Sequence, residues 1–131
     1  MAAAPRSRLP RRERLTSPSA FRSVFRKGVR LDGRLFLLIA LANDRGHDRL
    51  GVAVGKRVGG AVVRNRAKRR LREAFRGRPR RSGPEWDIVF VAKPDIAAAT
   101  QEELEREFGQ RLRRLVGRYA EGGRTRPSSP R

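Results

Sequence analysis

Residues 56–81 carry twelve Lys and Arg side chains and a single acid, Glu73, so one fifth of the chain supplies eleven of its twenty net positive charges. Like charges at this density repel one another, and the segment must therefore lie on a surface rather than inside a core. A solvated surface normally mixes both signs to limit such repulsion. The near-absence of acids favours a face that binds a polyanion over a face that meets only water.

The charge of the whole chain points to the same kind of partner. A formal net charge of +20 over 131 residues makes nucleic acid the natural counter-charge. An anionic membrane could attract it too, but the longest apolar run, residues 35–42, is far shorter than the roughly 20 residues that span a bilayer. Without cysteine, structural disulfides and thiolate chemistry are excluded. Because no signal-peptide pattern opens the chain, we expect a cytoplasmic location.

The length indicates one domain. Residues 1–14 hold five arginines and no apolar run, and residues 120–131 are rich in Gly, Pro, Ser and Arg. We expect these ends to be a disordered basic arm and a disordered tail. Residues 15–119 remain as the folded domain, which is long enough to bury a core without disulfide or metal support.

Three helices are predicted. A serine–proline pair at 17–18 suits the cap and first turn of a helix that ends near Gly28. Residues 61–76 place an apolar stripe opposite a basic arc. Thr100 and Glu103 form a capping box at the start of the last helix.

Strands are predicted between these helices. Residues 35–42 form a continuous apolar run, and residues 86–92 are apolar on both faces, which favours an interior position in a sheet. Residues 43–48 read as a hairpin loop. The predicted order is helix, two or three strands, helix, strand, helix, and it gives an α+β sandwich.

The strand at residues 50–56 has one face of small side chains, Gly51, Ala53 and Gly55. Such a face lets another group approach the backbone closely. That group is either a tightly packed helix or a ligand, and the residues alone favour the helix.

Catalysis by the protein itself is not indicated. The chain has one histidine, His47, in a polar loop. Most of its carboxylates are either scattered singly or gathered at the start of the last helix, where capping and the helix dipole explain them. The scattered set is Asp32, Asp44, Asp48, Glu85, Asp87 and Asp95, and the gathered set is Glu102, Glu103, Glu105 and Glu107. We therefore expect no catalytic residue and no metal-binding motif in the protein.

Three ordered segments resemble the bacterial ribonuclease P protein family. The first segment consists of residues 51–57 (GVAVGKR) followed by residues 61–76 (AVVRNRAKRRLREAFR), and it is similar to the family's strand ending in two basic residues and its R-N-R-x-K-R-x-x-R helix. Residues 14–28 and 87–93 agree in order and spacing, so the resemblance covers about residues 14–119. One departure, Arg57 in place of a second lysine after the strand, keeps the charge.

This resemblance implies both the fold and the activity. The expected fold is αβββαβα with a mixed four-stranded sheet. The expected function is that of the protein component of ribonuclease P, an endoribonuclease in which a catalytic RNA removes the 5′ leader of precursor tRNA. The implied partners are ribonuclease P RNA and precursor tRNA, with no membrane and no protein partner. Mg²⁺ would serve the RNA-catalysed reaction.

The resemblance also implies two groups of binding residues. The basic helix would hold the catalytic RNA through Arg64, Asn65, Arg66, Lys68, Arg69 and Arg72. A cleft between the sheet and the first helix would accept the leader at Phe21, Phe25, Lys56, Arg57 and Lys93. Aromatic rings can stack on bases without reading sequence, while lysines follow the backbone. Core packing is the alternative for the two phenylalanines, and their spacing alone favours it.

Two other functions remain open. A structural RNA-binding protein of ribosomal type would share the charge but take no part in cleavage. A DNA-binding protein would place residues 64–76 in a major groove, although no helix-turn-helix pair surrounds them.

Overall fold

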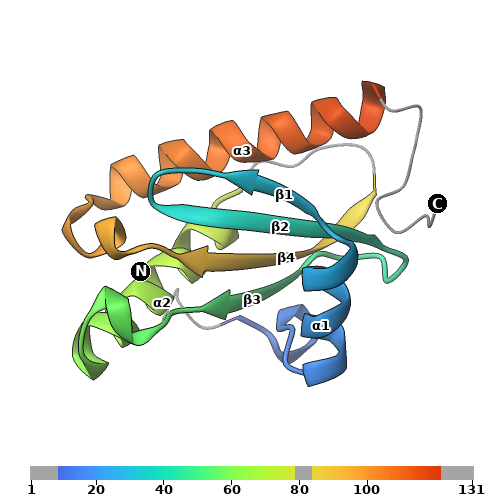
Figure 1. Ribbon diagram of the computed structural model, residues 1–131. Coiled ribbons are helices and arrows are strands. Elements are labelled where there is room, and N and C mark those ends of the chain that lie inside the picture. Colours follow the sequence, from blue (N-terminus) through green and yellow to red (C-terminus); the bar gives the residue numbers. More distant parts are fainter. Residues whose placement is uncertain (1–8, 79–83, 122–131) are drawn as a thin grey trace, which may run out of the picture.

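The computed structural model describes residues 9–78 and 84–121, and their arrangement confirms the predicted αβββαβα order and the mixed sheet (Figure 1). The strands lie in the order β1-β2-β4-β3, and only the β3–β4 pair is parallel. The helices and strands are α1 (Pro18–Lys27), β1 (Val29–Asp32), β2 (Phe36–Asn43), β3 (Arg49–Ala53), α2 (Ala61–Arg76), β4 (Glu85–Ala92) and α3 (Gln101–Glu121). Three short 3₁₀ helices are η1 (Arg11–Glu13), η2 (Lys56–Val58) and η3 (Pro94–Ala98).

The helix starts follow the predicted capping chemistry. The Ser17 hydroxyl accepts the Ala20 N–H of α1 at 3.3 Å. At the start of α3, Thr100 Oγ1 accepts the Glu103 N–H at 3.0 Å, and the Glu103 carboxylate accepts the Thr100 N–H at 2.9 Å. These bonds satisfy amides that have no partner inside the helix.

Gly28 ends α1 for a different reason from the usual left-handed cap. Its φ is −73°, which any residue can adopt. A Cβ at this position would lie 2.6 Å from the Val24 carbonyl oxygen and 2.7 Å from Ile39 Cγ2. The glycine is needed because the chain turns into β1 in close contact with β2.

The predicted hairpin at residues 43–48 is wrong. The segment joins β2 to β3, but β4 lies between these two strands and pairs with both. The turn residues correctly predict a reversal of the chain. They carry no information about β4, which follows about forty residues later in the sequence and pairs between β2 and β3. Because β4 is apolar on both faces, it takes the interior position, as its sequence predicts.

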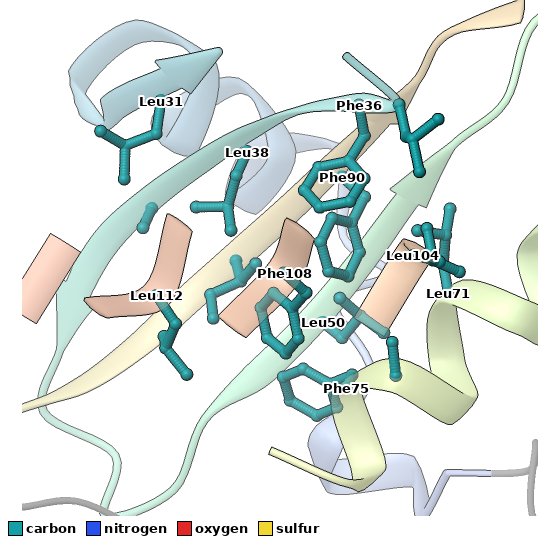
Figure 2. Packing of buried hydrophobic residues seen from close by; sticks show 14 of the residues in the cluster. Leu31, Phe36, Leu38, Leu50, Leu71, Phe75, Phe90, Leu104, Phe108 and Leu112 are labelled. Atoms are coloured by element: carbon teal, nitrogen blue, oxygen red, sulfur yellow. The ribbon is translucent and has the colours of Figure 1, made fainter. Parts of the chain in front are cut away.

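Alternation along the strands divides the core into two layers. On one face, Phe36, Leu38 and Phe90 pack against α2 and α3, as Figure 2 shows. Phe90 makes edge-to-face contacts with Phe36, with ring centroids 4.7 Å apart, and with Phe108 of α3, at 5.2 Å. This larger layer holds α2 and α3 firmly on the sheet.

The other face carries a smaller apolar layer beneath α1. Its buried members are Leu15, Val24, Ile39, Leu41 and Val89. Gly51 of β3 lies under Phe21 of α1, and a Cβ on this glycine would be 2.5 Å from the Phe21 Cζ. Helix packing therefore explains Gly51, whereas nothing lies within 4 Å of a Cβ built on Gly55.

The boundaries of the folded part differ from the predicted ones. Leu9 is 2% exposed and belongs to the larger core layer, and the Leu15 N–H donates to the Leu50 carbonyl at 2.8 Å. The structure places residues 9–14, which were predicted to belong to a disordered arm, against the folded part, where buried Leu9 anchors a segment whose composition is mostly charged. At the other end, α3 continues through Glu121. The rest of the predicted arm and tail, 1–8 and 122–131, lies outside the described residues.

Candidate nucleic-acid interface

The polar arc of α2 presents all six residues predicted to bind the catalytic RNA. Ala67, Leu71, Ala74 and Phe75 form the buried stripe of this helix. None of the six lies in that stripe: Asn65, Arg66 and Arg69 are exposed, and Arg64, Lys68 and Arg72 are half-buried. Half-buried basic side chains rest their carbon stems on the protein and keep their charge at the surface. The arc thus gathers five positive charges on one side of a rigid helix.

Arg70 belongs to the same charge run but has another role. Its guanidinium donates to Gln101 Oε1 at 3.2 Å, to the Ile96 carbonyl at 3.1 Å and to the Ala99 carbonyl. The Gln101 side-chain amide donates back to the Arg70 carbonyl at 3.1 Å. Burial, with the nearby charge of Arg66, lowers the pKa of Arg70. These contacts fix α2 to the start of α3.

The turn between η2 and α2 has a distinctive backbone and leaves an apolar side chain exposed. Gly59 has φ +152°, a conformation that suits glycine. Three residues later, in the first turn of α2, the Val62 side chain is 81% exposed. The Arg64 guanidinium donates to the Gly59 carbonyl at 3.1 Å. This bond fixes Arg64 beside the η2–α2 turn.

The α1 side of the sheet has a row of half-buried apolar residues that sequence reasoning missed. The strand register pairs Leu37 with Val91 and Val91 with Ala53, and all three are half-buried. Alternation puts them on the same face as Phe21 and Phe25. The apolar character of each was visible in the sequence, but their alignment was not, because it depends on β4 entering between β2 and β3.

Phe21 and Phe25 themselves are half-buried. Their rings stack with centroids 6.4 Å apart and an interplanar angle of 23°, and both pack against the smaller core layer. The two rings are thus partly packed and partly accessible, which is compatible with a support role and with contact to bases.

The three basic residues predicted for the leader lie at one end of the sheet. β3 and β4 are parallel, so Lys56 and Arg57 after β3 and Lys93 after β4 follow neighbouring carboxyl ends. The helices that follow these strands, η2 and η3, contact each other. Lys56 and Arg57 are exposed, and Lys93 is half-buried. The fold therefore brings together cations that are almost forty residues apart in the chain.

Lys93 is held by a carboxylate that sequence reasoning did not connect with it. Its ammonium donates to Asp32 Oδ1 at 2.7 Å and to the Gly33 carbonyl at 2.6 Å. The hydrogen bond from Lys93 lowers the pKa of Asp32. Asp32 stands alone before a turn glycine in the sequence. Only the register of β1, β2 and β4, which aligns Asp32 with Leu37 and Leu37 with Val91, brings it to the end of the sheet where Lys93 lies.

Two other carboxylates have structural partners. Asp87 accepts both Arg49 Nε at 2.9 Å and Arg49 Nη2 at 2.8 Å, and it also accepts the Asn43 amide at 2.7 Å. Asp48 accepts Arg78 Nε at 2.9 Å and the Trp86 N–H at 2.7 Å. These buried groups lock the strand ends.

Within residues 9–78 and 84–121, no group of three His, Cys, Asp or Glu side chains is placed to hold a metal ion. The His47 ring nitrogen Nε2 lies 2.9 Å from the Arg12 carbonyl oxygen. The same described residues contain no helix long and apolar enough to cross a membrane.

Sequence comparison identifies a family and relatives with curated names. The family model described as Ribonuclease P matches residues 9–116. The ribonuclease P protein component of Acidothermus cellulolyticus is 43% identical over 111 residues, which cover 82% of this chain and 92% of that protein. That of Roseiflexus castenholzii is 39% identical over 107 residues, which cover 75% and 88%.

Solved structures give the same result at the level of the fold. The RNase P protein of Staphylococcus aureus superposes with a TM-score of 0.68 at 26% identity, covering 79% of this chain and 94% of the other. The RNase P protein of Thermotoga maritima gives a TM-score of 0.67 at 26% identity, covering 78% and 96%.

Proposed function

This chain belongs to the bacterial ribonuclease P protein family, and we propose that it acts as the protein component of a ribonucleoprotein in which a catalytic RNA removes the 5′ leader of precursor tRNA. Family membership supports a role in the tRNA-processing complex. In our proposal the protein contributes binding and the RNA contributes the chemistry. The cytoplasm, where precursor tRNA is made in bacteria, is the proposed location.

The observation that carries the proposal is the polar arc of α2. Its five positive side chains and Asn65 stand on a helix that is fixed by Leu71 and Phe75 below and by Arg70 at its side. A rigid cationic helix binds phosphates without losing much side-chain and backbone freedom. Arginine adds planar, two-pronged hydrogen bonding to phosphate oxygens. This surface suits the folded backbone of the catalytic RNA.

The α1 side of the sheet suits the single-stranded leader. The half-buried rings of Phe21 and Phe25 are apolar, and so is the row formed by Leu37, Val91 and Ala53. Lys56, Arg57 and Lys93 supply charge beside that row, at the end of the sheet where β3 and β4 have their carboxyl ends. Stacking on aromatic rings beside a cationic path binds single strands with little dependence on sequence. We therefore assign the leader to this face and the catalytic RNA to α2.

Mg²⁺ belongs to the RNA in this proposal. The described residues offer no three-ligand cluster for it, so we derive no step through a protein-bound metal. What this chain can do is lower the repulsion between two polyanions, since its charge is +20. Less Mg²⁺ would then be needed to bring the catalytic RNA and its substrate together.

Reconstitution tests the proposal directly. Precursor tRNA is incubated with the catalytic RNA of the same organism at low Mg²⁺, with and without the full-length protein, and release of the 5′ leader is measured. We expect the protein to accelerate leader release and to cleave nothing alone. A protein of ribosomal type would bind RNA without this acceleration. Cleavage by the protein in the absence of the RNA would contradict the assignment of the chemistry.

A further inference from the structure

The segment before α1 is fixed at both of its ends. Leu9 is buried in the core layer shared with α2 and α3, and Leu15 is buried in the layer beneath α1. Between them, Arg14 forms an isolated parallel bridge with Leu50 of β3. The Arg14 guanidinium donates from Nε to the Leu9 carbonyl at 3.1 Å. Arg14 is exposed. The bridge and the hydrogen bond nevertheless fix its position along the outer edge of β3.

The bridge also decides which face of the sheet Arg14 takes. Residues paired across a ladder carry their side chains on the same face, and successive residues alternate. Leu50 points into the layer beneath α2, while Leu15 points into the layer beneath α1. Arg14 thus lies on the α2 side, away from the face to which we assign the leader.

On that side α2 packs against β3, while α3 contacts β1 at the opposite edge of the sheet. Arg70 of α2 faces α3, and Arg72, two residues later and about 200° around the helix, lies on the other side of α2, toward the outer edge of β3 where Arg14 lies. The positive charge of Arg14 adds to burial in lowering the pKa of Arg72, in agreement with this placement. The carboxylates next to them in the chain, Glu13 and Glu73, form no ion pair with either one in the described part of the molecule. Two cations held together without a counter-charge are stabilised when an anion binds between them.

We propose that Arg14 and Arg72 together bind one phosphate of the catalytic RNA, so that the RNA-binding surface of α2 continues across the edge of β3 onto the N-terminal segment. This inference rests on the proposed function, since it extends the surface assigned to the catalytic RNA. Two guanidiniums can share the oxygens of a single phosphate, and the anchoring of Arg14 reduces the entropy lost on binding.

Salt-dependent binding of the full-length protein to the catalytic RNA tests this pair. The variants are Arg14→Ala, Arg72→Ala and the double variant. Each phosphate contact contributes about 0.7–0.9 to the slope of log affinity against log salt. We expect both single variants to bind more weakly, and we expect the double variant to lose about one contact's worth of slope, or about 0.7–0.9. A loss of about two contacts' worth, or about 1.4–1.8, would mean separate phosphates and would overturn the shared site.

Two further variants control for charge and for folding. Arg114→Ala removes one exposed charge from α3, the helix that contacts β1 at the opposite edge of the sheet, and should leave the slope nearly unchanged. Arg14→Gln removes the charge of Arg14 but keeps a side-chain donor for the Leu9 carbonyl, so it separates RNA binding from anchoring. An equal effect of Arg114→Ala, or normal RNA binding by Arg14→Gln, would overturn the proposal.

The remaining outcomes separate this inference from the proposed function. If Arg64→Ala weakens binding to the catalytic RNA while both Arg14 variants bind normally, only the Arg14–Arg72 pair fails. If neither Arg64→Ala nor the Arg14 variants change that binding, the assignment of α2 fails as well. A loss that appears only with precursor tRNA and not with mature tRNA would assign Arg14 to the leader and overturn its assignment to the catalytic RNA.

Discussion

Phe21 of α1 covers Gly51 of β3 so closely that a Cβ on the glycine would lie 2.5 Å from the Phe21 Cζ and 2.8 Å from its Cε1. These distances explain why residue 51 is a glycine, because the Phe21 ring occupies the space that a side chain of residue 51 would need. It also makes the position of the ring dependent on the strand below it. Any atom added to residue 51 must move a side chain that we assign to the leader surface.

Gly51→Ala should therefore displace the Phe21 ring. We expect a loss of stability of about 1–3 kcal/mol, typical of overpacking, together with weaker binding of precursor tRNA. Gly55→Ala is the matched control, because nothing lies within 4 Å of its Cβ and its φ of −89° suits alanine. Thermal melts and precursor affinity measured on both variants check this. If Gly55→Ala loses as much as Gly51→Ala, the contact with Phe21 is not the cause.

Phe25→Ala separates leader binding from packing. Stacking on a base is worth roughly 1–3 kcal/mol, and truncating a fully buried phenylalanine costs about 3–5 kcal/mol. Because Phe25 is only half-buried, we expect a stability loss of about 1–2 kcal/mol. Affinity for a precursor with a leader of several nucleotides should fall, while affinity for mature tRNA should not.

Lys56→Ala provides the control for that experiment. Lys56 is exposed, so its removal should leave the melting temperature unchanged and still copy the leader-specific loss. Suppose instead that Phe25→Ala strongly lowers the melting temperature and affects both RNAs alike, with no effect of Lys56→Ala. The phenylalanines would then be core residues only, and the leader surface would lie elsewhere.

The ion pair between Lys93 and Asp32 predicts a dependence of stability on pH. Lys93 lowers the pKa of Asp32 in the folded state below its value in the unfolded chain. The stabilisation is therefore present above the unfolded pKa, near 4, and is lost as the pH falls through the lower folded pKa. Asp32 is exposed, so solvent screening keeps the effect small.

Denaturant unfolding of Asp32→Asn and of the unsubstituted protein between about pH 2 and pH 6 measures this dependence. The difference in stability between the two should be largest above pH 4 and should shrink toward pH 2. Lys93→Ala should give the same profile, because it removes the other half of the pair. A difference that is constant over this range would show that the pair does not set the pKa of Asp32.

The sequence predicted where individual helices and strands begin better than it predicted which strands lie side by side. Ser17 and Thr100 cap helices where their hydroxyls indicate, because capping depends on residues three positions away. The insertion of β4 between β2 and β3 depends on contacts across forty residues, so the turn at 43–48 could not reveal it.

The same distinction holds for the candidate site. The residue pattern of α2 was enough to predict its polar arc, since a helix fixes which side chains share a face. Strand register, which the sequence does not reveal, produces two other features of the site. These are the row of Leu37, Val91 and Ala53 and the pairing of Lys93 with Asp32. Arg14 was missed because the burial of Leu9, which fixes its segment, is not visible in a run of arginines.

Arg69 and Arg70 are neighbours in one charge run, and their environments predict opposite consequences of substitution. Arg69 is exposed on the polar arc. Arg70 instead donates to Gln101, to the Ile96 carbonyl in η3 and to the Ala99 carbonyl just after η3. Arg69→Ala should weaken binding to the catalytic RNA and flatten its salt dependence by roughly 0.7–0.9 without changing the melting temperature. Arg70→Ala should cost about 1–3 kcal/mol of stability, because it leaves partly buried carbonyl groups without donors.

The melting temperature and the salt dependence of RNA binding are measured for Arg69→Ala and Arg70→Ala, which have the same net charge. Each variant removes one arginine from the same helix, so net charge cannot explain a difference between them. Arg70→Lys is a second control, since a lysine keeps the charge but lacks the planar guanidinium that reaches three acceptors. It should be less stable than the unsubstituted protein. If Arg69→Ala and Arg70→Ala lose equal stability and equal affinity, α2 does not divide its arginines between an RNA-binding arc and an anchor to α3.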